Sequence, residues 1–240
     1  MKLTAKDIAK MIDLSCVRTI SNQADIEEIV AAAMKYGFGQ VSINQCFIPY
    51  TKQLLKDAPD IHLVGNVSFP IGSDSTSVKV FQAKEMVATG CDELDVVINV
   101  GKLKSGSLAE VEEDLREVIQ AAKPLPVKVI IEIMYLSREE TKQACEICIR
   151  SGAKFVKTGT GWADRGTTID DVKLVKSLVG DKALIKASGG IRNLHGLLDL
   201  YEAGARRFGV NLKSGISIVE EALAMHNGIE VKMNKYGSHG

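Results

Sequence analysis

Several features that mark special classes of protein are scarce in this 240-residue chain. Thirty Lys and Arg residues balance thirty Asp and Glu residues, so the net charge is zero, and no cluster of basic residues stands out. That balance argues against nucleic-acid binding. No apolar run reaches the roughly 18 residues of a membrane span. The N-terminal stretch MKLTAKDIAKMIDLS also lacks the apolar core of a signal peptide. Secretion, membrane insertion and nucleic-acid binding are therefore not expected.

Cysteine and histidine are too few and too scattered to indicate a disulfide framework or a metal site. The five cysteines are an odd number, so reduced thiols in the cytoplasm fit better than paired ones. Cys145 and Cys148 have the spacing of a redox or zinc motif, but they share one face of a helical stretch, so we expect core packing. The four histidines show no ligand spacing. We predict a cytoplasmic protein that uses no metal or other cofactor.

Short β-branched runs alternate with longer amphipathic stretches along the chain. The expected strands are residues 10–16, 40–44, 62–69, 93–100, 127–134, 155–161, 183–189 and 206–212. Because a helical pattern separates each consecutive pair, a parallel sheet with helices on its faces is expected. Eight such units match an α/β fold of the (β/α)8 TIM-barrel type, in a single domain over residues 1–240. The alternative is a doubly wound open sheet, but no GxGxxG follows the first strand to support it.

Helix starts are marked by residues with the spacing of a capping box, in which a hydroxyl and a carboxylate satisfy free backbone N–H groups. These are Ser107 with Glu110, Ser137 with Glu140 and, in a weaker form, Thr168 with Asp171. A short helix within residues 1–9, capped by Thr4, is expected to cover the N-terminal face of the barrel. The polar tail, residues 226–240, is expected to fray.

Charged residues interrupt four expected strands, although parallel barrel strands are covered on both faces and exclude charges that are neither paired nor used. They are Asp95, Lys128, Glu132, Lys157 and Lys186. The two-residue period places Lys157 and Lys186 on adjacent strands, both facing the lumen. One interpretation is a structural layer in which Asp95 and Glu132 neutralise two lysines. The other is that ammonium repulsion and desolvation lower the pKa of one lysine, which then attacks carbonyls. The pair Asp92-Glu93, near the start of its strand, is expected to be solvated.

The segment after Lys157 suits a lysine that forms a Schiff base. Thr158 and Thr160 offer hydroxyls to a substrate, and the two glycines of KTGTG leave space beside the amine. Trp162 follows and either walls the site or packs outside the barrel mouth. This spacing indicates a lysine imine and says nothing about the substrate.

Two glycine-containing loops follow the last two strands, where TIM barrels often bind phosphate through backbone N–H groups at a helix N-terminus. The candidate phosphate-binding residues are Ser188, Gly189 and Gly190 after one strand, and Gly209, Asn211 and Lys213 after the other. The plainer alternative is that these glycines only make turns.

A series of peptides in this chain resembles the deoxyribose-phosphate aldolase family, in order, from about Thr4 to Ala224. The peptides are GCDELDVVINVGKLKSG, VKVIIEI, FVKTGTGW followed by GTTIDDVKL, IKASGGIR and AGARRFG. The resemblance implies a class I aldolase that reversibly cleaves 2-deoxy-D-ribose 5-phosphate to acetaldehyde and D-glyceraldehyde 3-phosphate without a metal. It also implies that Lys157 forms the Schiff base, that Lys186 perturbs its pKa and joins proton transfer, and that Asp95 completes the relay.

The chain departs from the family pattern at four places. Asp13-Leu14-Ser15 stands where Asp-His-Thr is usual, Gly159 replaces a serine, and Ser42 replaces a common cysteine. GVNLKSG replaces the usual Gly-Thr-Ser-Ser-Gly phosphate loop, so either Lys213 supplies a point charge for phosphate or the preferred substrate has changed.

Two alternatives to the deoxyribose-phosphate aldolase therefore stay open. One is a related lysine-dependent aldolase or lyase for a different phosphorylated sugar, and the other is a non-catalytic barrel that binds a sugar phosphate. The expected partners are a phosphorylated sugar and an aldehyde, and a homo-oligomer (dimer or tetramer) is one possibility.

Overall fold

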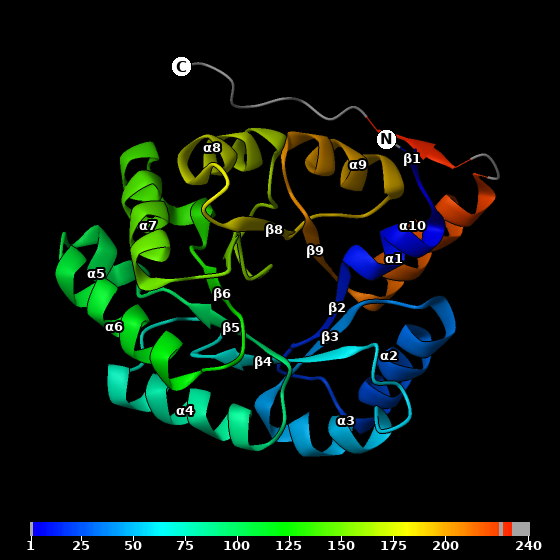
Figure 1. Ribbon diagram of the computed structural model, residues 1–240, viewed down its shortest axis with the longest axis horizontal. Helices are drawn as coiled ribbons and strands as arrows, with labels where there is room; N and C mark the ends of the chain where they lie inside the picture. The colour runs from blue at the N-terminus through cyan, green and yellow to red at the C-terminus, as the bar shows by residue number, and fades with distance from the viewer. Residues whose placement is uncertain (1, 226–227, 232–240) are drawn as a thin grey trace.

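The computed structural model describes residues 2–225 and 228–231, and within them eight parallel strands close into a barrel (Figure 1). The strands are β2 (Ile12–Cys16), β3 (Gln40–Ile43), β4 (His62–Val67), β5 (Glu93–Val97), β6 (Val127–Ile130), β7 (Phe155–Lys157), β8 (Leu184–Ser188) and β9 (Arg207–Val210). Each strand pairs with the next in chain order, and β9 pairs with β2 to complete the ring. The TIM barrel is confirmed and the open sheet is excluded.

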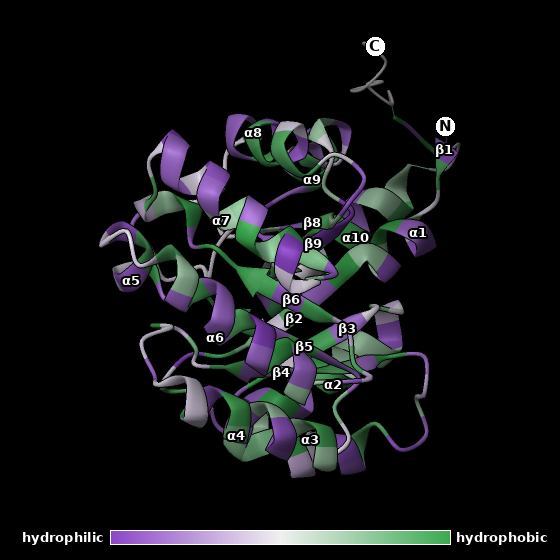
Figure 2. Cartoon of the chain, turned by 60° about the vertical axis from the view of Figure 1, so that its left-hand side comes forward, coloured by the Kyte–Doolittle hydropathy of each residue, from purple (hydrophilic) through white to green (hydrophobic). Residues whose placement is uncertain are grey.

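Helices connect the strands and cover the outside of the barrel (Figure 1). They are α1 (Ala5–Met11), α2 (Gln23–Tyr36), α3 (Ile48–Leu54), α4 (Thr76–Ala88), α5 (Val100–Lys104), α6 (Leu108–Ala121), α7 (Arg138–Ser151), α8 (Ile169–Val179), α9 (Leu194–Ala203) and α10 (Leu212–Ala224). Their hydrophilic faces point outward and hydrophobic residues gather toward the strands (Figure 2). In α6, for example, Val111, Leu115 and Val118 share one buried face at helical spacing. No helix within the described ranges is long and apolar enough to cross a membrane.

Seven of the eight strands end earlier than expected at their C-terminal ends, and in two of them apolar β-branched residues continue beyond the sheet. The expected strand 93–100 ends at Val97, and α5 begins at Val100. The expected strand 127–134 ends at Ile130, since Glu132 adopts a left-handed φ of 41° and a 3-10 turn follows at Ile133–Tyr135. A hydrophobic pattern cannot distinguish the end of a strand from the apolar loop that follows it.

Capping boxes are present at three of the four proposed helix starts. They join Thr4 to Asp7, Ser137 to Glu140 and Thr168 to Asp171. Ser107 makes no capping hydrogen bond within the described chain. Its expected partner Glu110 instead pairs with Lys102, at 2.7 Å. The capping box at Ser107 was therefore a wrong prediction.

The N-terminal helix and the C-terminal tail both lie against other parts of the fold. In α1, Ile8 is buried, and the carbonyl of Ala9 accepts a hydrogen bond from the N–H of Gly39, just before β3. Helix α1 therefore lies beside the N-terminal ends of the strands. Strand β1 (Lys2–Leu3) pairs antiparallel with β10 (Ile229–Glu230), so the expectation of fraying is wrong for that part of the tail. The rest of the tail, 226–227 and 232–240, lies outside the described residues.

Candidate active site

Two buried lysines lie side by side at the C-terminal ends of neighbouring strands. Lys157 is the last residue of β7, and the strand register places it level with Lys186 of β8. A carboxylate oxygen of Asp95, on β5, lies 2.7 Å from Nζ of Lys157 and 2.8 Å from Nζ of Lys186. The lysine pair expected from the sequence is therefore present, and Asp95 bridges the two amines.

The pKa of Lys157 is lowered to about 8. Burial is the largest cause, and the positive charge of Lys186 adds to it, while the carboxylate of Asp95 opposes both. At pH 7 about one-tenth of such amines are neutral, against about 3 in 10,000 for an ordinary lysine. The interpretation as a nucleophile anticipated this direction, but burial has a larger effect than the repulsion between the two amines.

Lys186 behaves in the opposite way because it has two acidic neighbours. Its amine donates to the carboxylates of both Asp13 and Asp95. Burial disfavours its charge, but these carboxylates outweigh burial and raise its pKa above the usual range. Lys186 is therefore the cation of the pair, and Lys157 is the amine that loses its proton first.

Glu132 does not take part in an ionic layer with these lysines. Its carboxylate accepts hydrogen bonds from the backbone N–H of Thr160, at 3.2 Å, and from the hydroxyl of the same residue. The left-handed backbone at Glu132 is uncommon for a residue other than glycine and is costly to maintain. Glu132 therefore orders the segment that follows Lys157 rather than neutralising a lysine.

Lys128 and Glu93 form a further buried ion pair in the lumen. Nζ of Lys128 lies 2.6 Å from a carboxylate oxygen of Glu93 and 3.0 Å from one of Asp95. The expectation that Asp92-Glu93 is solvated is thus wrong for Glu93, which faces the lumen and is buried. Asp92 is partly exposed, and its carboxylate accepts a hydrogen bond from the N–H of Leu63.

The threonine and glycine that follow Lys157 support the backbone rather than opening space. Thr158 is fully buried, and its hydroxyl accepts a hydrogen bond from the N–H of Ser188, so it joins the ends of β7 and β8. A Cβ on Gly159 would lie 2.9 Å from the methyl group of Met134 and 3.0 Å from a carboxylate oxygen of Glu132. The space expected beside the amine at Gly159 is therefore already filled.

A cavity of about 130 Å³ opens at the mouth of the barrel, above the ends of β7, β8 and β9. Its walls include six of the residues predicted to bind substrate or phosphate: Thr160, Ser188, Gly189, Gly190, Gly209 and Asn211. Gly189 and Gly190 have φ values of 97° and 81°, which side chains rarely allow, so this turn requires glycine. The volume equals that of about four water molecules, which is enough for a small anionic group.

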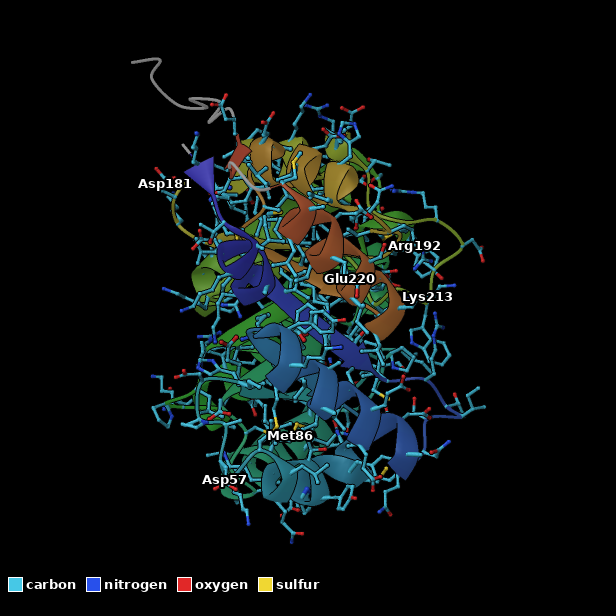
Figure 3. The ribbon with its side chains drawn as sticks, turned by 90° about the vertical axis from the view of Figure 1, so that its right-hand side faces the viewer. Asp57, Met86, Asp181, Arg192, Lys213 and Glu220 are labelled. Atoms are coloured by element: carbon cyan, nitrogen blue, oxygen red, sulfur yellow. The ribbon has the colours of Figure 1, made fainter. Side chains whose placement is uncertain are left out.

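Lys213 lies in the first turn of α10, not in a loop before it. Asn211 caps this helix, because its side-chain oxygen accepts a hydrogen bond from the N–H of Ser214 at 2.9 Å. Lys213 lines a larger neighbouring cavity of about 760 Å³. Figure 3 shows Lys213 and Arg192 on the same side of the molecule, near the start of α10.

Two arginines that the sequence analysis does not select, Arg18 and Arg192, line both cavities. The guanidinium of Arg18 lies 4.8 Å from the ring centroid of Trp162 and donates to the carbonyl of Gly161 at 3.2 Å. Trp162 is 38% exposed and lines the mouth cavity, so its position at the mouth is settled. Arg192 ends the peptide IKASGGIR and could have been found there. Arg18 lies in a loop without any such signal.

The pair Cys145 and Cys148 has the environment of core residues rather than of a redox or metal site. Cys145 and Cys148 are buried in α7, and burial raises the pKa of Cys145 to about 12 and that of Cys148 well above its usual value. Such thiols are inert core residues. In the part of the chain that the structure describes, no group of three or more His, Cys, Asp or Glu residues could hold a metal ion.

The sequence is similar to known aldolases along most of its length. A deoxyribose-phosphate aldolase of Carboxydothermus hydrogenoformans is 44% identical over 222 residues, which are 91% of this chain and 96% of that protein. One of Rhizobium meliloti is 38% identical over 226 residues, covering 94% and 91% of the two chains.

Solved structures give the same result. The aldolase QR15 is 40% identical, with a TM-score of 0.86 over 92% of this chain and 97% of that one. A tetrameric deoxyribose phosphate aldolase from Aeropyrum pernix is 26% identical, with a TM-score of 0.85 over 92% and 93%. Residues 8–218 match the family described as DeoC/LacD family aldolase. With eight barrel strands and the lysine pair inside that match, the chain belongs to the DeoC/LacD aldolase family.

Proposed function

We propose that this protein is a Schiff-base aldolase that reversibly cleaves 2-deoxy-D-ribose 5-phosphate to acetaldehyde and D-glyceraldehyde 3-phosphate. The observation that carries the proposal is Lys157, a buried amine with its pKa lowered to about 8 and a single carboxylate, Asp95, at 2.7 Å. The substrate is supported by the relatives named deoxyribose-phosphate aldolase, which align over about nine-tenths of this chain.

The reaction begins with the neutral amine of Lys157. It attacks the C1 carbonyl of the open-chain sugar, and loss of water leaves a protonated imine. The imine draws the electrons of the C2–C3 bond toward nitrogen as the 3-hydroxyl gives up its proton. The bond breaks, glyceraldehyde 3-phosphate leaves, and an enamine remains on Lys157.

The enamine then takes a proton at C2, and water hydrolyses the new imine to release acetaldehyde and free Lys157. Asp95 contacts the nitrogen atoms of both lysines, so it provides the path by which a proton passes between Lys157 and Lys186. Lys186, held protonated by Asp13 and Asp95, keeps a positive charge next to the reacting nitrogen. That charge favours the neutral form of the free Lys157 amine.

The phosphate is assigned to the 130 Å³ cavity at the mouth. Gly189, Gly190 and two arginines, Arg18 and Arg192, line this cavity, so backbone N–H groups and guanidinium groups are available to an anion there. Lys213 remains the second candidate for the charge partner, from the larger cavity beside it. Arg192 is preferred because a guanidinium can bind a phosphate through two parallel hydrogen bonds.

The decisive experiment traps the imine. The protein is incubated with 2-deoxyribose 5-phosphate and sodium borohydride, and peptide mass spectrometry locates the reduced adduct. We expect the adduct on Lys157, and Lys157→Met should abolish both the adduct and the release of acetaldehyde while retaining the circular dichroism spectrum. An adduct on Lys186 in the wild type would refute the assignment. Trapping by other sugars alone would favour a different phosphorylated substrate, and no trapping would favour the non-catalytic barrel.

We also infer a homo-oligomer. The relative from Aeropyrum pernix is described as a tetramer, and it shares this barrel over 92% of the present chain. Light scattering during size-exclusion chromatography gives the mass directly, and a mass near the 26.0 kDa of one chain would refute the inference.

A further inference from the structure

The lumen contains a second set of charges beneath the reactive amine. Lys128, on β6, is fully buried, and the strand register places it level with Asp95. One oxygen of Asp95 lies 3.0 Å from Nζ of Lys128, and the other contacts Lys157 and Lys186. Asp95 is therefore shared among three lysines, whose charges hold its pKa well below the usual range despite its burial.

The charged groups of the lumen come from six strands and leave one positive charge in excess. The cations are Lys128, Lys157, Lys186 and Arg207, and the anions are Asp13, Glu93 and Asp95. The loss of one proton from a lysine balances the set. The other two strands each place one further side chain beside Glu93. His62 is half exposed and lies 3.1 Å from Glu93, and Gln40 is uncharged.

Contacts with carboxylates decide which lysine loses that proton. Lys128 has Glu93 and Asp95 within ion-pair distance, and Lys186 has Asp13 and Asp95. Among the described residues, Lys157 has Asp95 alone at that distance. The protonation of Lys157 therefore depends on how far the other two lysines already neutralise the charge of Asp95.

We propose that Lys128 is a positioning residue that sets the charge state of Lys157 through their shared carboxylate, Asp95. Lys128 holds one oxygen of Asp95 and neutralises part of its charge, so less remains to keep a proton on Lys157. Glu93 limits this effect, because it pairs with Lys128 at 2.6 Å. The consequence for turnover rests on the proposed function of Lys157, but the ionisation itself can be measured without turnover.

Two substitutions should move the pKa of Lys157 in opposite directions. Lys128→Met leaves three cations against three anions, so Lys157 should retain its proton to a pH about one unit higher. Glu93→Gln leaves four cations against two anions, so the pKa of Lys157 should fall. A purely structural role of either residue would reduce the folded fraction without moving the pKa of Lys157 in these two directions.

Competitive labelling with acetic anhydride measures that pKa, because only neutral amines react and mass spectrometry quantifies the peptide that contains Lys157. Lys79→Met is the matched control. Lys79 is also fully buried and pairs with Asp114 at 2.7 Å, but it lies between α4 and α6, outside the lumen. This control should lose stability and keep the labelling midpoint of the wild type.

A wild-type midpoint in folded Lys128→Met, or an equal shift in Lys79→Met, would overturn the proposal. If Lys128→Met does not fold, Glu93→Gln decides, and an unchanged or higher midpoint would refute the role of Lys128. The midpoints could also shift as expected while neither the wild type nor any variant cleaves the sugar phosphate. In that case the proposed function fails and this inference stands.

Discussion

Arg192 and Lys213 can be compared directly as charge partners for the phosphate, through Arg192→Met and Lys213→Met. Both side chains are exposed, and both lie near the start of α10 (Figure 3). They differ in that Arg192 lines both cavities, including the one formed by Gly189 and Gly190, while Lys213 lines only the larger one. Each methionine removes one charge and keeps an unbranched side chain.

The expected effect follows from the energy of one charge-assisted contact. Such a hydrogen bond contributes about 1.5–3 kcal/mol, and the exposure of Arg192 places it at the lower end. Since 1.36 kcal/mol corresponds to a factor of ten, Arg192→Met should raise KM about tenfold. The value of kcat should change little, because the phosphate keeps this contact in the transition state. Lys213→Met should stay within about twofold, as a screened surface charge would.

Acetaldehyde release is measured with 2-deoxyribose 5-phosphate and with unphosphorylated 2-deoxyribose. All three proteins should process the unphosphorylated sugar equally, because it lacks the group that Arg192 binds. Inhibition by inorganic phosphate should weaken in Arg192→Met by the same factor as KM. A tenfold effect in Lys213→Met with none in Arg192→Met would place the phosphate in the larger cavity. No effect in either variant would show that backbone N–H groups alone hold it.

Four further predictions concern catalysis and stability. The value of kcat/KM should increase with pH through about 8, since Lys157 must lose a proton whose pKa lies there; a midpoint near 10 in the rate profile would contradict this. Lys186→Met should slow turnover and raise that midpoint, because it removes the cation that helps to lower the pKa of Lys157; a midpoint that falls would be inconsistent with the charge balance. Thr168→Ala should lower the free energy of unfolding by about 1 kcal/mol in denaturant titrations, because Thr168 caps α8, whereas Ser107→Ala should change it little; equal losses would refute the difference in capping. EDTA should leave activity unchanged, and a loss that zinc restores would indicate a metal-dependent aldolase.

The barrel and the lysine pair could be predicted because both depend on local periodicity. Strands covered on both faces are apolar throughout, so the charges of Lys157 and Lys186 stood out, and the two-residue period gave their direction. Their position on adjacent strands then followed from chain order. Asp95 was found by resemblance and by the same irregularity in its strand.

Other parts of the site depend on contacts that the alternation of hydrophobic and polar residues does not predict. The position of Glu93 at the start of its strand predicts a solvated side chain, yet Glu93 lies two residues before Asp95, which is level with Lys128, and it forms an ion pair with Lys128. The sequence pattern predicts Lys213 in a loop, but the Asn211 cap starts α10 at Leu212, one residue before Lys213. Glu93 is held by a partner on another strand, and the start of α10 is set by a hydrogen bond from the backbone to Asn211. The hydrophobic pattern of the sequence contains no signal for either interaction.

The pairing of β1 with β10 determines how the enzyme can be attached to a surface. This short sheet joins Lys2 to Glu230, and Figure 3 shows β1 on the side of Asp181, opposite Arg192 and Lys213. A linker placed beside Lys2 would hold the barrel with its mouth turned toward the solution. Immobilised in this orientation, the protein should admit a phosphorylated sugar as freely as it does in solution.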